Sequence, residues 1–194
     1  KAICDEIKKT LKANKPLVNT SDPLPTQRGK YVTNKHVLST SLEVFNEVTK
    51  LKIRDIASSF IGEKPILKNA RTYLIKKGDP RFPWHADNIL PDGSYDSSKG
   101  IVCILYLVDD SDEGTFWLSN FKSWDKEKKK KINPTIEQFS KWEDGKEVSR
   151  IKAEKGDLFI FNQNLYHRHI ANKYDVQALF FQITGRSVES TEKI

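Results

Sequence analysis

Cysteines and long apolar runs are scarce in this sequence, and each scarcity excludes a class of protein. The two cysteines, Cys4 and Cys103, are too few for a disulfide framework or a thiolate zinc site. No apolar run approaches the roughly 20 residues of a membrane-spanning helix, so an integral membrane protein is excluded. No basic region followed by an apolar stretch opens the chain, which predicts a cytoplasmic protein without a signal peptide.

The composition that remains is that of a folded, basic domain. The 194 residues are 37% hydrophobic and include ten Phe, six Tyr and four Trp, which argues against a disordered chain. The 33 Lys and Arg residues outnumber 26 Asp and Glu, giving a net charge of +7. This charge favours an anionic partner: nucleic acid, an anionic membrane surface, or a small anionic substrate or cofactor.

The first third of the chain has the periodicity of helices. Ile3, Ile7 and Leu11 recur at helical spacing, and Ser41 is a candidate cap for a second helix that ends near Gly62. We expect one apolar stripe on that second helix, formed by Leu42, Phe45, Val48, Leu51, Ile56 and Phe60. Such a stripe predicts a helix that packs on the core of the protein.

From Pro65 onward, short strand-like segments alternate with turn residues and predict a β-sandwich or barrel. The predicted strands cover residues 71–76, 101–108, 115–118, 148–153, 157–161 and 176–184. A polar insertion at 120–145 interrupts them, and five of its six residues at 126–131 are lysine. Because no aromatic residues are interleaved with these lysines, the insertion predicts a solvated loop or short helix rather than a nucleic-acid surface.

Three of the four histidines, His85, His167 and His169, lie in the strand-rich half, and one of them is two residues from a carboxylate. In His85-Ala86-Asp87 an imidazole and a carboxylate lie two residues apart, hence on one side of an extended segment. A strand-like segment farther along leads through a short turn to His167. Two imidazoles and one carboxylate on one face of a metal suit non-haem Fe(II), because the remaining positions stay open. His169 remains an alternative third ligand, since residues two apart in a strand share a face.

Three segments together resemble the 2-oxoglutarate and Fe(II)-dependent dioxygenase superfamily. Within it, the prolyl-hydroxylase-like branch is the most similar in the pattern of residues along these segments. They are Trp-His-Ala-Asp-Asn at 84–88, the apolar run at 102–107, and the stretch at 156–168 that begins Gly-Asp-Leu-Phe. The resemblance implies an α+β, mainly β fold: a double-stranded β-helix (jelly-roll or cupin-like) core with supporting N-terminal helices. It further implies one oxygenase domain over 1–194, with helical support and a loop at 1–64, the core at 65–187 and a tail at 188–194.

The resemblance also implies the site. His85, Asp87 and His167 fall on the three iron-ligand positions of the family, and its spacing favours His167 over His169. The implied cofactors are Fe(II), 2-oxoglutarate as co-substrate, and O₂. The presence of Asp87 favours hydroxylation over halogenation, since halogenating relatives have a small residue there.

The co-substrate contacts depart from the family. Tyr106 matches a position whose hydroxyl can bind the far carboxylate of 2-oxoglutarate, but Gln177 stands where the family has Arg or Lys, ten residues after the last iron ligand. Glutamine cannot form the bidentate ion pair of an arginine with a carboxylate. Arg71, Arg186 or Lys173 could supply the missing cation. Alternatively, Gln177 and Tyr106 bind 2-oxoglutarate weakly, the co-substrate is a different compound, or the iron site serves a different reaction.

We therefore expect an oxygenase that hydroxylates an unactivated C–H bond, in a prolyl or other amino-acid side chain, of a peptide or small molecule. Phe82, Trp84 and Trp117 are expected to line its pocket, with segments 19–35 and 88–99 as lids. The alternatives are a cupin-like metalloenzyme that does not use 2-oxoglutarate and, with least support, a basic nucleic-acid-binding module.

Overall fold

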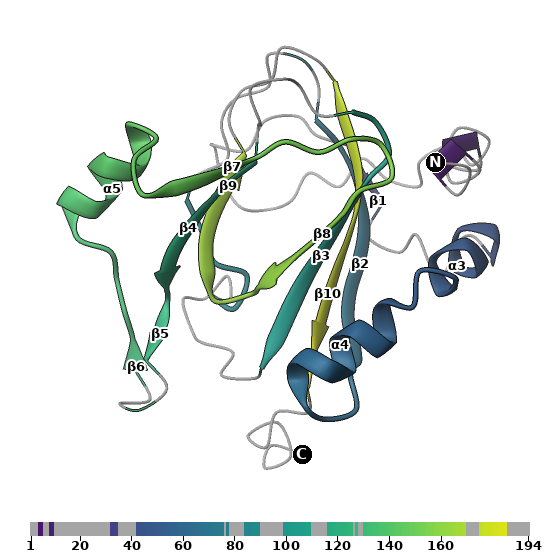
Figure 1. Ribbon diagram of the computed structural model, residues 1–194, viewed down its shortest axis with the longest axis horizontal. Coiled ribbons are helices and arrows are strands. Elements are labelled where there is room, and N and C mark those ends of the chain that lie inside the picture. The colour runs from purple at the N-terminus through teal and green to yellow at the C-terminus, as the bar shows by residue number, and fades with distance from the viewer. Residues whose placement is uncertain are drawn as a thin grey trace.

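Two antiparallel β-sheets face one another in the computed structural model (Figure 1). The structure describes residues 4–5, 8–9, 32–34, 42–75, 77, 84–89, 99–109, 116–125, 127, 130–169 and 175–185. The larger sheet has the strand order β1 (Val32–Asn34), β2 (Ile66–Ile75), β10 (Val176–Thr184), β3 (Gly100–Tyr106), β8 (Leu158–Asn162). The smaller has the order β7 (Val148–Ile151), β4 (Phe116–Lys122), β9 (Leu165–His169). The predicted double-stranded β-helix is confirmed.

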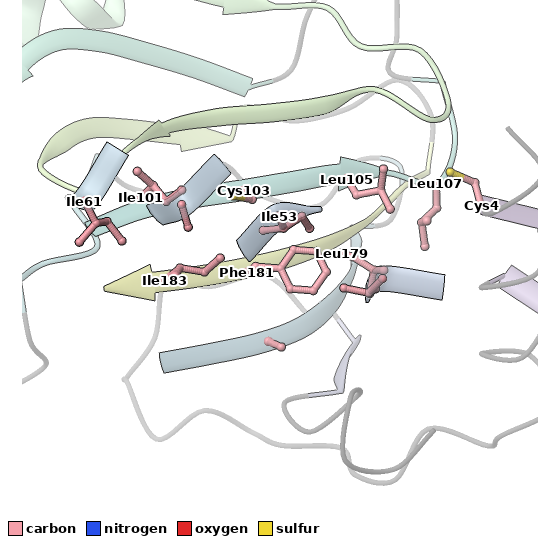
Figure 2. Packing of buried hydrophobic residues seen from close by; sticks show 13 residues of the cluster. Cys4, Ile53, Ile61, Ile101, Cys103, Leu105, Leu107, Leu179, Phe181 and Ile183 are labelled. Carbon is pink, nitrogen blue, oxygen red and sulfur yellow. The ribbon is translucent and has the colours of Figure 1, made fainter. Parts of the chain in front are cut away.

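Strand alternation gives the larger sheet two buried faces, because successive side chains point to opposite sides. On β3 and β10 the odd-numbered residues, among them Cys103, Leu105, Leu179 and Phe181, belong to one hydrophobic core. The helices α3 (Leu42–Thr49) and α4 (Ile53–Ile61) cover this face, as Figures 1 and 2 show. The even-numbered residues belong to a second core between the two sheets; they include Val102, Ile104, Tyr106, Val176, Ala178 and Phe180.

The helical segment after residue 41 differs from its prediction. It is two helices, because the chain turns at residues 50–52 and Lys52 adopts a left-handed conformation with φ 52°. The turn changes the face presented by the second helix, so Ile53, Ala57 and Ile61 of α4 are buried while Phe60 is 69% exposed. The predicted single stripe is therefore wrong at both ends, and Leu42 is also 69% exposed. The predicted end at Gly62 is confirmed: Gly62 caps α4 with φ 77°.

The polar insertion carries more structure than predicted. It contains a two-stranded hairpin, β5 (Trp124–Asp125) and β6 (Lys130–Lys131), followed by the helix α5 (Ile136–Glu143). Thr135 and Gln138 form a capping box at the start of α5, a signal that the sequence contains at this spacing. Trp142 is buried and packs with Tyr166 of β9, so α5 covers the outer face of the smaller sheet.

Little of the N-terminal region lies within the described residues. Residues 4–5 and 8–9 are helical, and Cys4 is buried in the helix-covered core near Leu107, as Figure 2 shows. The expected loop at 19–35 contains the short strand β1, which pairs with β2, and its remainder lies outside the described residues. Within the ranges given above, no helix is both long enough and apolar enough to cross a bilayer.

Candidate metal centre

Pairing between distant backbone segments brings the candidate ligands together. His85 donates its backbone N–H to the carbonyl of His167 over 3.0 Å, and His167 donates to the carbonyl of His85 over 2.9 Å. Asp87 follows His85 in the same segment, and its N–H donates to the Gln163 carbonyl over 3.1 Å. The ligand segment 84–89 is thereby fastened to the chain around β9.

The side chains of His85, Asp87 and His167 form one cluster whose ligand atoms all lie within 4.8 Å of one another. His85 Nε2 is 4.0 Å from Asp87 Oδ1, and His167 Nε2 is 3.4 Å from Asp87 Oδ2. His167 is buried, with 3% of its surface exposed, and its Nδ1 lies 3.0 Å from the Leu165 carbonyl. A proton on Nδ1 satisfies that carbonyl and leaves the Nε2 lone pair directed at the cluster, as in metal-bound histidines.

This donor set fits Fe(II). Asp87 Oδ2 is buried and accepts no hydrogen bond from the described residues, so it has capacity for a cation. Two neutral imidazoles and one carboxylate suit an iron ion that keeps open positions, whereas oxygen-only sets suit Mg²⁺ or Ca²⁺ and thiolate-rich sets suit Zn²⁺.

A pocket opens beside this cluster between the two sheets. Besides the three clustered residues, it is lined by Arg71, Ile104, Phe116, His169, Val176, Ala178 and Phe180. Its walls are therefore mainly apolar, and Arg71 is the one Lys or Arg among these lining residues. Arg71 lies on β2 directly across from Phe180 of β10, with its guanidinium carbon 4.6 Å from the centre of the Phe180 ring.

The structure does not bring Gln177 to this pocket. Its strand neighbours Val176 and Ala178 both line the pocket, so alternation directs the Gln177 side chain to the opposite face of the sheet. Gln177 is ten residues after His167, but a count along the chain does not show which face of β10 that residue occupies.

The other residues expected to contact the co-substrate are Tyr106, Arg186 and Lys173. Tyr106 is fully buried in the core between the sheets, opposite Ala178, and is not among the lining residues. It shares a strand face with Ile104, which does line the pocket. Arg186 and Lys173 lie outside the described residues.

His169 lines the pocket but is not a member of the His–Asp–His cluster. Its ring packs edge-on against Phe116, with centroids 5.1 Å apart. Burial, together with the nearby His167 and His85, lowers the pKa of His169 to about 3, so the ring is neutral near pH 7. His169 is thus a neutral polar group on the pocket wall.

Trp117 was expected to line the pocket, but its neighbour Phe116 does so instead, because successive side chains of β4 point to opposite faces of the sheet. Phe116 faces the pocket, so Trp117 faces outward, where it packs against the guanidinium groups of Arg150 and Arg168. Trp84 also lies outside the pocket, packed against Arg168 and the ring of Trp142.

Phe82 and the segment 88–99 were expected to line and to cover the pocket. Phe82 and most of the expected lid at 88–99 lie outside the described residues. Asn88 is fully buried and accepts a hydrogen bond from Ser123 over 2.9 Å, so the start of that segment is anchored rather than part of a lid.

The chain has relatives in one family and among solved structures. The phytanoyl-CoA dioxygenase (PhyH) family matches residues 1–174. No curated protein matches the sequence. HygX from Streptomyces hygroscopicus, solved with nickel, 2-oxoglutarate and hygromycin B bound, is 14% identical with a TM-score of 0.69, covering 94% of this chain and 78% of HygX.

Two further structures share the fold at similar identity. EctD from S. alaskensis with 2-oxoglutarate and 5-hydroxyectoine is 12% identical with a TM-score of 0.66, covering 95% of this chain and 67% of EctD. SnoK from nogalamycin biosynthesis, a non-heme alpha-ketoglutarate-dependent carbocyclase, is 14% identical with a TM-score of 0.68, covering 94% and 73%.

Proposed function

Since this chain belongs to the phytanoyl-CoA dioxygenase (PhyH) family, we propose that it hydroxylates an unactivated C–H bond of a small molecule at the pocket beside His85, Asp87 and His167. The predicted enzyme class, a non-haem Fe(II) and 2-oxoglutarate-dependent dioxygenase, is confirmed by the family. The closeness to the prolyl-hydroxylase-like branch is not confirmed. The nucleic-acid-binding alternative has no support from the family.

The observation that carries this proposal is the His–Asp–His cluster in the wall of a mainly apolar pocket. His85, Asp87 and His167 would hold the iron. When bound, Fe(II) with 2-oxoglutarate supplies O₂ activation coupled to oxidative decarboxylation of the co-substrate. The protein would orient the reactants and exclude water. Ile104, Phe116 and the other apolar lining residues keep water out of the pocket, and the backbone pairing of His85 with His167 holds the proposed ligands in place.

We assign the far carboxylate of 2-oxoglutarate to Arg71. Its guanidinium lines the same pocket as the three ligands and lies against Phe180. The apolar surroundings lower the local dielectric, which strengthens a charge-assisted hydrogen bond to a carboxylate. With Arg71 as the carboxylate contact, a glutamine at position 177 no longer favours a cupin-like enzyme that does not use 2-oxoglutarate.

The substrate proposal is a small molecule, with an amino-acid side chain as a narrower possibility. HygX and EctD were solved with hygromycin B and 5-hydroxyectoine, respectively. Both are small polar molecules, which supports testing such compounds before peptides. We further propose that residues 1–194 form one oxygenase domain, because described helices and strands from both ends of the chain share one core.

The test is anaerobic titration of the protein with Fe(II) and 2-oxoglutarate, followed by visible absorption, and then succinate release in air across a panel of amino acids, small polar molecules and peptides. We expect a weak visible charge-transfer band in the wild type. His85→Ala and Asp87→Ala should lose both the band and stoichiometric iron. Absence of the band and of succinate in the wild type would contradict the proposal.

A further inference from the structure

Two buried glutamines, Gln163 and Gln182, contact the backbone of Asp87. Gln163 is fully buried and Gln182 is 6% exposed. The Gln182 side-chain amide donates to the Asp87 backbone carbonyl over 3.1 Å and to Gln163 Oε1 over 3.2 Å. Because the Asp87 N–H also donates to the Gln163 carbonyl, the backbone of Asp87 is held on both sides.

These residues connect three distant segments of the chain. Gln182 lies on β10, on the same alternation as Ala178 and Phe180, which line the pocket. Gln163 lies in the turn between β8 and β9, and its N–H donates to the Gly100 carbonyl at the start of β3 over 3.2 Å. The Gln182 amide therefore fastens the ligand segment 84–89 to the larger sheet, whereas the pairing with His167 fastens it to the smaller one.

The position of the Asp87 carboxylate depends on this backbone. Its Oδ2 accepts no hydrogen bond from the described residues, so no described donor fixes the carboxylate at that oxygen. The side chain nevertheless lies between His85 Nε2 at 4.0 Å and His167 Nε2 at 3.4 Å. Its direction is then set by where the backbone of residue 87 is held.

We propose that Gln182 is a positioning residue: its side-chain amide fixes the backbone of Asp87 so that the carboxylate faces both histidines. This inference rests on the proposed metal centre and deepens it. Both N–H groups of the Gln182 amide are used, one on the ligand residue and one on Gln163. A buried amide with two defined acceptors holds its partners in a single arrangement, since any displacement leaves buried polar groups unpaired.

The first test replaces Gln182 with methionine, which keeps the length of the side chain and removes the donor. Calorimetric titration of the purified protein with Co(II) measures metal affinity, and the visible spectrum of the Co(II) form reports the ligand geometry. Loss of groups that orient metal ligands commonly weakens binding by roughly 10- to 100-fold, and we expect a loss in that range for Gln182→Met. A changed Co(II) spectrum should accompany it.

The matched control is Ile183→Val, on the next residue of the same strand. Ile183 is buried in the core on the helix-covered face of the sheet, away from Asp87. This variant should lower the melting temperature without changing Co(II) affinity or the Co(II) spectrum. If both variants weaken Co(II) binding alike, the role of Gln182 is general stability and the inference is overturned.

A second variant, Gly100→Ala at the start of β3, disturbs the hydrogen bond between Gln163 and Gln182 from another strand. In Gly100→Ala the added Cβ would lie 2.4 Å from Gln163 Cδ, so the Gln163 amide must leave the position in which it accepts the hydrogen bond from Gln182. We expect this variant also to weaken Co(II) binding, which keeps the inference testable if Gln182→Met fails to fold. In the metal-free protein, hydrogen exchange of the Asp87 amide should be faster in both variants than in the wild type and Ile183→Val.

The outcomes separate the two proposals. A wild type that binds no Co(II) contradicts the metal centre itself. A wild type that binds Co(II), with Gln182→Met and Gly100→Ala binding equally well and exchanging the Asp87 amide at the wild-type rate, overturns only the role of Gln182.

Discussion

His85 and His167 exchange two backbone hydrogen bonds, of 3.0 and 2.9 Å, and their imidazole rings lie 4.3 Å apart between centroids. The two residues that we propose as iron ligands are therefore paired by their main chains as neighbouring strand residues are. Pairing of this kind holds the side chains close before any metal binds. It favours rapid metal binding without rearrangement of the chain, because the cost of ordering the ligands is met by folding.

The choice between His167 and His169 as metal ligand can be decided by substitution. His167→Ala should lose stoichiometric Fe(II) or Co(II), because its Nε2 belongs to the cluster, whereas His169→Ala should retain the metal. Metal content after anaerobic gel filtration, measured by elemental analysis, checks this. Metal that is lost from His169→Ala and kept by His167→Ala would reverse the assignment.

Replacement of Arg71 tests the proposed co-substrate contact. Arg71→Met should weaken 2-oxoglutarate binding by about 10- to 100-fold, the effect of losing a charge-assisted hydrogen bond, while Fe(II) binding is kept. Gln177→Met is the control, because the Gln177 side chain lies on the far face of β10. Titration of 2-oxoglutarate into the Fe(II)-loaded protein measures both. A large loss in Gln177→Met with none in Arg71→Met would refute the assignment.

The turn between α3 and α4 gives a stability prediction. Ile61 is 1% exposed in the helix-covered core, so Ile61→Ala should lower the free energy of unfolding by about 2–5 kcal/mol. Leu42 is 69% exposed, and Leu42→Ala should change it by no more than about 0.5 kcal/mol. Urea unfolding followed by tryptophan fluorescence measures both. Equal losses would favour the unbroken apolar stripe.

The thiol of Cys103 should react only in unfolded protein. Burial raises the pKa of Cys103 from 9.0 to about 12, and its side chain is fully buried. Because the unfolded thiol ionises near pH 9 and the folded one near pH 12, this group stabilises the fold below pH 9 and the contribution is lost as pH rises from about 9 to 12. At pH 8, labelling with a disulfide reagent should require denaturant. Fast labelling of Cys103 in native buffer would contradict this burial.

The sequence predicted those parts of the fold and site that depend on local pattern. The His85-x-Asp87 motif places two candidate ligands on one side of a segment by spacing alone. The strand-like segments between turn residues predicted most of the strands.

Features that depend on register or on distant contacts were not predictable. The face on which Gln177 lies follows from the pairing of β10 with β2 and β3, which no count along the chain reveals. The turn at Lys52 uses a left-handed conformation in a residue that is not glycine, so no glycine marks it. The contact of Gln182 with Asp87 joins residues on separate segments, and nothing in either local sequence indicates it.

The alternation of β10 has a consequence for how such enzymes diverge. Since this strand gives one face to the pocket and the other to the helices, inserting or deleting one residue before Ala178 would exchange the two sets of side chains beyond that point. An insertion or deletion of one residue here would thus alter the pocket and the helix interface at the same time. Arg71, which we propose as the co-substrate contact, lies on the neighbouring strand β2, so a substitution there would alter the pocket without exchanging the two faces of β10.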